Sequence, residues 1–212
     1  MTMSPAGLAP NVPTVAPLPI CSASTRAAKH GHTIELMSRN PAKAQVLAEQ
    51  IGNGATVGTF GARPAGDIVI VAVPYAGAVE AVAHYGDALA GKTLIDITNP
   101  FNADGTGLVT TAGDSMSQRI AAVAPASADV VRAFNTILGN VLAQDKPVDA
   151  FFAGDSAEAK TRVAAFLKSL DMRPLDAGTL GMAHALEWAG LLLVGVARNG
   201  AGFDIALGAK AL

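Results

Sequence analysis

A short strand followed directly by a helix is the feature that most narrows what this chain can fold into. Thr33–Ser38 reads as the strand, and Pro41–Ile51 begins with proline, which is favoured at the first helical position. In a doubly wound nucleotide-binding fold, the second strand ends at the adenosine ribose, where a carboxylate would suit NAD. Ser38, Arg39 and Lys43 offer a hydroxyl and two cations instead, which suits the 2′-phosphate of NADP. The same pattern also fits the solvated start of a helix.

Strand and helix patterns alternate along most of the chain. The apolar runs at residues 67–73 and 92–98 are typical of strands buried on both faces. We therefore predict an α/β class: a doubly wound, Rossmann-like, mostly parallel sheet with a short C-terminal α/β extension that ends in an apolar helix. Further strands are expected at 55–60, 129–135, 150–153 and 173–177, and further helices at 22–30, 77–85, 115–123, 156–170 and 180–198.

The chain is expected to have three parts. Residues 1–22 form an irregular, proline-rich N-terminus with a degenerate first strand and loop. Residues 23–145 form a dinucleotide-binding domain, and residues 146–212 form an extension that completes the sheet and the acceptor or dimer side. Because proline cannot donate a ladder hydrogen bond, we expect no central strand within the first 19 residues.

Polar or turn-forming residues follow the best predicted strands. Pro74 and Asn99 come directly after two of them, and Asn135 ends a third. Parallel sheets bind ligands beyond these carboxyl ends. Asparagine both donates and accepts hydrogen bonds, which suits a carboxamide or a ribose. Each position alone is also explained by turn chemistry. Together, at the ends of several parallel strands, they predict a ligand cleft.

Four segments resemble a known family. SRNPAK at 38–43, VAVP at 71–74, DITNP at 96–100 and RAFNT at 132–136 resemble the NADPH-dependent reductases of the deazaflavin coenzyme F-420 and related predicted dinucleotide-binding proteins. The resemblance runs from about residue 23 to about 196 and extends to the ferric-reductase domains of metalloreductases. It implies NADP(H) as cofactor and hydride transfer to a deazaflavin-like or other small acceptor. It assigns the 2′-phosphate to Ser38, Arg39 and Lys43, the adenosine and pyrophosphate side to Ala72, Val73 and Pro74, and the nicotinamide end to Asn99, Pro100, Asn135 and Thr136.

The phosphate loop of the family is missing its glycines. The three positions fall near Val15, Pro17 and Ile20, and proline lacks the N–H group that would bind phosphate. One alternative is therefore a cofactor-deficient Rossmann-fold binding or assembly protein without catalytic activity. A second is a reading-frame error upstream of residue 23. A reductase of small imine or keto substrates is less favoured, because such enzymes carry a larger helical domain.

The composition of the chain excludes some classes of binding partner. The net charge of −2 and the lack of a basic block argue against nucleic acid and anionic membranes. The apolar run at 189–197 is shorter than the roughly 20 residues of a membrane span, so we expect a cytoplasmic protein. One cysteine and scattered histidines predict no metal site.

His184 and Glu187 fit either a substrate pocket or a polar helix edge, and Trp188 fits the core or a homodimer interface. No catalytic residue is assigned.

Overall fold

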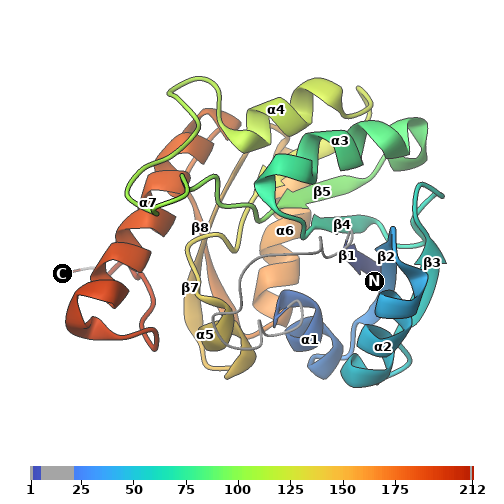
Figure 1. The fold of residues 1–212 in the computed structure, drawn as a ribbon, viewed down its shortest axis with the longest axis horizontal. Helices are drawn as coiled ribbons and strands as arrows, with labels where there is room; N and C mark the ends of the chain where they lie inside the picture. The colour runs from blue at the N-terminus through green and yellow to red at the C-terminus, as the bar shows by residue number, and fades with distance from the viewer. Residues whose placement is uncertain (1, 6–21, 211) are drawn as a thin grey trace.

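The computed structural model describes residues 2–5, 22–210 and 212 of the chain. The described residues form an eight-stranded sheet in the order β3-β2-β1-β4-β5-β6-β7-β8, with helices on both faces (Figure 1). This is the predicted doubly wound α/β fold. The strands are β1 Thr2–Pro5, β2 Thr33–Ser38, β3 Thr56–Thr59, β4 Ile68–Val71, β5 Thr93–Asp96, β6 Asp129–Arg132, β7 Val148–Gly154 and β8 Met172–Asp176.

The helices follow the predicted alternation, with one addition. They are α1 Ser22–Lys29, α2 Pro41–Ile51, α3 Tyr75–Tyr85, α4 Met116–Val123, α5 Gly139–Ala143, α6 Ala157–Ser169 and α7 Ala183–Val196, with short turns η1 Gly86–Leu89, η2 Leu180–Met182 and η3 Ala197–Ala201. The prediction lacked α5, which has only five residues and so little periodicity.

The prediction that no central strand forms within the first 19 residues is wrong. β1 lies between β2 and β4 and is parallel to both, with Met3 opposite Ile34 and Ile68. Pro5 is its last residue, so the residues before it keep the amide donors that a central strand needs. Residues 6–21, including Val15, Pro17 and Ile20, lie outside the described residues.

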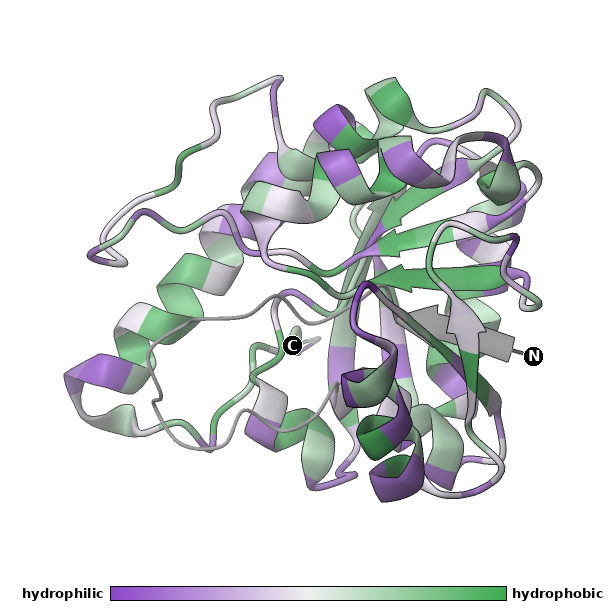
Figure 2. Cartoon of the chain, turned by 45° about the vertical axis from the view of Figure 1, so that its right-hand side comes forward, coloured by the Kyte–Doolittle hydropathy of each residue, from purple (hydrophilic) through white to green (hydrophobic). Residues whose placement is uncertain are grey.

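The sheet separates two apolar layers. Along β4, Ile68 and Ile70 pack in the layer formed with α1, α2 and α6, while Val69 and Val71 pack in the layer formed with α3 and α4. This alternation follows from the strand's period of two, and it explains why all four β4 residues are buried. In Figure 2 the central strands are among the most hydrophobic parts of the cartoon.

The C-terminal part extends the sheet by one antiparallel and one parallel pairing. β7 runs antiparallel to β6, with Val131 opposite Gly154, and β8 runs parallel to β7. The sheet is therefore mostly parallel, as predicted. Helix α7 then packs against α4 and β7.

The last helical segment is longer than the apolar run suggested. By length and composition Leu180–Ala201 could cross a membrane, and 44% of its most apolar window is buried inside the protein. The core helix of a globular protein has the same properties, so this finding alone assigns no membrane.

Candidate functional site

The carboxyl end of β2 opens onto a pocket of about 550 Å³. Ser38 ends the strand and accepts a hydrogen bond from the Asn40 backbone N–H at 3.1 Å. Asn40 in turn caps α2 by accepting from the Lys43 N–H at 3.1 Å. The turn between β2 and α2 is thus fixed by its own side chains. The pocket is lined by Ser38, Arg39, Pro41, Val57, Gly58, Thr59, Phe60, Glu80, Ala81 and His84.

Two of the three residues predicted for the 2′-phosphate line this pocket. Ser38 and Arg39 do so, while Lys43 is exposed one turn along α2 and is not among the lining residues. Arg39 reaches across to α3, since a methyl group added at Gly77 would lie 3.9 Å from its Nη2 atom. The guanidinium therefore spans the opening between the end of β2 and the first turn of α3.

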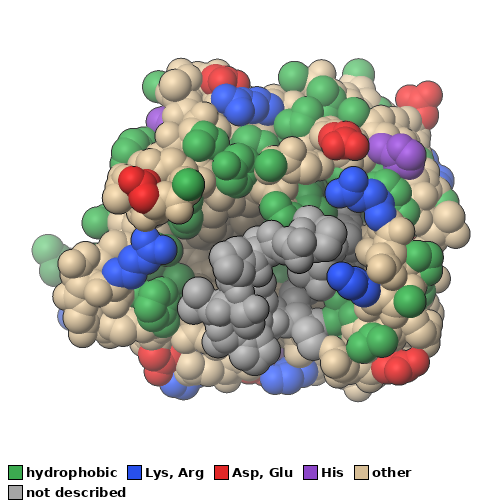
Figure 3. Space-filling view, viewed as in Figure 1, with side chains coloured by type: hydrophobic (Ala, Val, Ile, Leu, Met, Phe, Trp, Pro, Cys, Tyr) green, Lys and Arg blue, Asp and Glu red, His purple; other side chains and the backbone are tan. Residues whose placement is uncertain are grey.

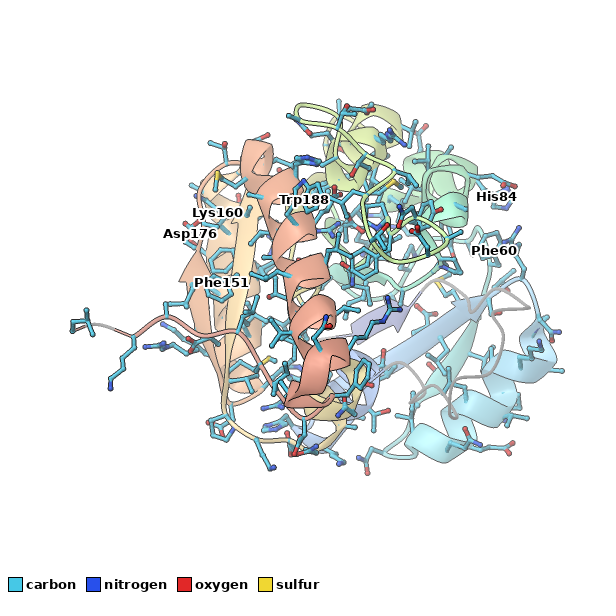
Figure 4. All side chains as sticks on the ribbon, turned by 60° about the vertical axis from the view of Figure 1, so that its left-hand side comes forward. Phe60, His84, Phe151, Lys160, Asp176 and Trp188 are labelled. Carbon is cyan, nitrogen blue, oxygen red and sulfur yellow. The ribbon has the colours of Figure 1, made fainter. Side chains whose placement is uncertain are left out.

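The far wall of the pocket contains side chains that the sequence did not single out. His84 of α3 stacks on Phe60, with ring centroids 4.9 Å apart and an angle of 17° between planes (Figure 4). Tyr85 meets the edge of Phe60 at 5.1 Å, and burial raises the pKa of Tyr85 to about 12. Glu80 and His84 are four residues apart on α3, so the helical spacing after β4 could have indicated them.

Ala72, Val73 and Pro74 connect β4 to α3, because the strand ends at Val71, two residues before its predicted end. Ala72 donates a backbone hydrogen bond to the Ile70 carbonyl at 3.1 Å, and Pro74 accepts from the Gly77 N–H at 2.9 Å in the first turn of α3. β4 is parallel to β2, β5 and β6, so this connection lies at the same sheet edge as the pocket.

Asn99 and Asn135 are brought together at the ends of β5 and β6. Asn99 Nδ2 donates to the Asn135 carbonyl and Asn135 Nδ2 donates to Asn99 Oδ1, each at 3.3 Å. Asn135 Nδ2 also donates to the Leu186 carbonyl of α7 at 2.7 Å. Gly190 of α7 packs directly on this pair, and an added methyl group there would lie 3.0 Å from Asn99 Oδ1. The two amides therefore join the sheet edge to α7.

The residues beside this amide pair are buried and partly unpaired. Thr98 Oγ1, Asn135 Oδ1 and Thr136 Oγ1 have no hydrogen-bond partner among the described residues. Pro100 is buried and accepts from the Val109 N–H at 2.9 Å. Phe134 has a φ of 63°, a left-handed conformation that is uncommon outside glycine. Strained backbone and unpaired buried polar atoms are typical of binding sites.

Three fully buried charges lie behind the amide pair. Arg132 Nη1 contacts Asp96 Oδ2 at 2.6 Å and lies 3.7 Å from Glu187 Oε1. Glu187 also accepts from the Met116 backbone N–H at 2.8 Å and from Thr110 Oγ1 at 2.6 Å. Charges removed from water need such partners. Of the two interpretations of Glu187, the polar helix edge is therefore wrong. Apart from His184, three residues away, its partners come from residues far away in the chain.

The outer face of α7 differs from its inner face. Trp188 is 49% exposed, and its Nε1 donates to His184 Nε2 at 3.1 Å. Its exposure excludes a core position within the described residues, and the homodimer interface stays a prediction. Figure 4 shows Trp188 on α7, well apart from Phe60 and His84. On the face seen in Figure 3, acidic and basic side chains are interspersed.

Comparisons with known proteins agree with this geometry. Residues 22–100 match the family model described as NADP oxidoreductase, coenzyme F420-dependent. Metalloreductase STEAP3 of Rattus norvegicus is 29% identical over 170 residues, which cover 78% of this chain and 33% of that protein. The chain thus spans about a third of the length of this curated relative.

Solved structures share the fold over most of the chain. The hypothetical protein SMa0349 from Sinorhizobium meliloti has a TM-score of 0.70 and 26% identity, covering 85% of this chain and 86% of its own. A candidate F420-dependent NADP-reductase from Arthrobacter sp. FB24 has a TM-score of 0.73 and 23% identity, covering 92% and 93%. An imine reductase from Aspergillus terreus, solved with NADPH4, has a TM-score of 0.66 and 19% identity, covering 93% and 61%.

The solved structures and the family model support different conclusions. At the lower identities the structures show the fold alone, whereas the family match covers β2, α2, β4, α3 and β5, which hold the predicted phosphate corner. The resemblance predicted from the sequence is confirmed: residues 22–100 match the model of the coenzyme F420-dependent NADP oxidoreductase family.

Proposed function

We propose that the chain is an NADP(H)-dependent oxidoreductase that transfers a hydride between nicotinamide and a small acceptor, with a deazaflavin-like ring as the favoured acceptor class. One observation carries the proposal: Ser38 and Arg39 line a single pocket at the carboxyl end of β2. A hydroxyl and a guanidinium at this position suit a ribose 2′-phosphate, because guanidinium pairs with phosphate through two parallel hydrogen bonds.

The described residues fit such a cofactor at both ends. At the adenosine end, Arg39 extends to the first turn of α3, beside the aromatic wall of Phe60 and His84. At the other end, Asn135 and Thr136 keep unpaired oxygen atoms that a carboxamide can use. Both ends lie at the edge formed by the carboxyl ends of parallel strands, where dinucleotides bind in such sheets.

Catalysis on this proposal comes from positioning. Nicotinamide, when bound, supplies the hydride chemistry. Ser38 and Arg39 would hold the phosphate, and Asn135 would orient the carboxamide so that one ring face meets the acceptor. Asn135 and Thr136 are themselves buried, so water does not compete for their unpaired oxygen atoms. Correct placement of two reactants can supply much of the rate enhancement.

A second candidate function is favoured by one feature of the sequence. The positions expected for the phosphate-loop glycines are Val15, Pro17 and Ile20, and a loop without glycines and with proline binds a pyrophosphate poorly. On this alternative the chain keeps the fold as a cofactor-deficient binding or assembly module.

Titration with NADPH, followed by its fluorescence, separates the two candidates. We expect saturable binding and a preference for NADPH over NADH. Arg39→Asp should weaken NADPH binding about 10- to 100-fold and shift the preference towards NADH, because the carboxylate repels the 2′-phosphate. Arg63→Asp is the matched control, since Arg63 contacts the Ala90 carbonyl and does not line the pocket. No binding at millimolar NADPH would favour the binding module.

A further inference from the structure

The amide of Asn135 has only one orientation compatible with its surroundings. The Leu186 carbonyl, 2.7 Å away, only accepts hydrogen bonds, so the atom facing it must be Nδ2. The second hydrogen of Nδ2 is directed to Asn99 Oδ1 at 3.3 Å. Both donors are thus used within the protein, and Oδ1 is a buried acceptor without a partner among the described residues. Such an atom selects a ligand that donates a hydrogen bond.

The Leu186 carbonyl that sets this orientation belongs to the residue directly before Glu187. Glu187 is fully buried and tied to Met116 of α4 and to Thr110. It also faces Arg132, which pairs with Asp96 and donates a hydrogen bond to the Thr98 carbonyl. These contacts fix the first turns of α7 relative to the ends of β5 and β6. They anchor the backbone from which the Leu186 carbonyl points.

We propose that Glu187 is a positioning residue: it holds the Leu186 carbonyl so that Asn135 presents Oδ1 to the primary amide of the nicotinamide carboxamide. The inference rests on the proposed function and adds to it a specificity for the carboxamide group of the cofactor. The site would favour dinucleotides whose pyridine ring carries an N–H donor at this position. An acetyl group in place of the carboxamide would leave Asn135 Oδ1 buried and unpaired.

The test compares two dinucleotides that differ in one group. NADP⁺ carries the carboxamide, and 3-acetylpyridine adenine dinucleotide phosphate replaces its amino group with methyl. Both dissociation constants are measured by calorimetry. The readout is the dissociation constant of the acetyl analogue divided by that of NADP⁺. We expect the natural protein to bind the acetyl analogue about 10-fold more weakly, which is the usual effect of leaving one buried acceptor unpaired.

Glu187→Ala should lower this ratio towards one, by weakening NADP⁺ while leaving the acetyl analogue nearly unchanged. A purely structural role would weaken both ligands equally and keep the ratio. Glu187→Gln should restore it, because the glutamine oxygen still accepts from the Met116 N–H and its amino group can donate to Thr110. Gly195→Ala on α7 is the control, since nothing lies within 4 Å of the added methyl; it should leave the ratio unaltered.

If Glu187→Ala does not fold, Thr110→Val removes one hydrogen bond to Glu187 and should lower the ratio partially. A ratio of one in a natural protein that binds both dinucleotides overturns the inference and leaves the proposed function intact. An unchanged ratio in Glu187→Ala, or in Thr110→Val if that is the variant that folds, overturns it as well. Binding of neither dinucleotide would defeat the proposed function, and the inference would fall with it.

Discussion

At the scale of single residues, Arg26 stabilises the fold more than its place in a short helix suggests. It is fully buried and donates to the carbonyls of Leu170, Lys146 and Asp171 at 2.9, 3.0 and 3.4 Å. Arg26→Met should lower the free energy of unfolding by roughly 2–4 kcal/mol, because these carbonyls lose their donor. Urea unfolding measures the loss. Arg119→Met, at an exposed pair with Asp114, is the control and should change stability little.

The location of single residues could be predicted where the determinants are local. Ser38 and Arg39 line the pocket because the strand end and the Asn40 cap fix their positions within a few residues. Glu187 was misread because its partners, Arg132 and Thr110, lie far away in the sequence. The periodicity of one helix cannot indicate which charge from another element will meet it.

At the scale of elements, the approach of α7 to the sheet edge depends on one glycine. Gly190→Ala would place a methyl group 3.0 Å from Asn99 Oδ1 and from the Asn135 carbonyl oxygen, tighter than ordinary packing. In Gly195→Ala the added methyl meets nothing within 4 Å. Alanine is favoured over glycine inside helices by about 1 kcal/mol, so Gly195→Ala should raise the melting temperature and Gly190→Ala should lower it. Thermal unfolding of both variants measures this, and equal shifts would contradict the close approach.

Element boundaries were predictable to the extent that each element has its own start and stop residues. Thr33–Ser38 and Pro41–Ile51 agree with the structure residue for residue, because the chain supplies both a capping Asn40 and a proline at the first helical position. The antiparallel direction of β7 was not predicted. Strand direction is set by how the chain returns to the sheet, and neither strand's pattern encodes it.

At the scale of the whole molecule, acid should reduce stability over a defined range. The hydrogen bond with His30 lowers the pKa of Asp145, and the hydrogen bond from Arg173 lowers the pKa of Asp149, both from an ordinary 3.8. A carboxyl group whose pKa is lower in the folded state than in the unfolded state stabilises the folded state. This contribution is complete at a pH above the unfolded-state pKa and is lost as the pH falls through the folded-state pKa. The melting temperature should therefore decrease as the pH is lowered below about 4.

The matched variant for this prediction is Asp149→Asn. The amide that replaces the carboxylate has no charge to lose, so the melting temperature of the variant should start lower at about pH 6 and decline less between about pH 4 and pH 2. Parallel curves for the variant and the natural protein would contradict the contribution of the Asp149–Arg173 pair, whose closest atoms lie 2.5 Å apart.

Trp188 of α7 is an intrinsic fluorescence probe. Trp188 is the single tryptophan, and it donates to His184, whose Nδ1 lies 3.3 Å from Glu187 Oε2. A polar relay therefore runs from solvent inward to the carboxylate that anchors the helix. Any loosening of the Glu187 contacts should change the fluorescence emission of Trp188, so a tryptophan at the surface can report on a carboxylate that is fully buried.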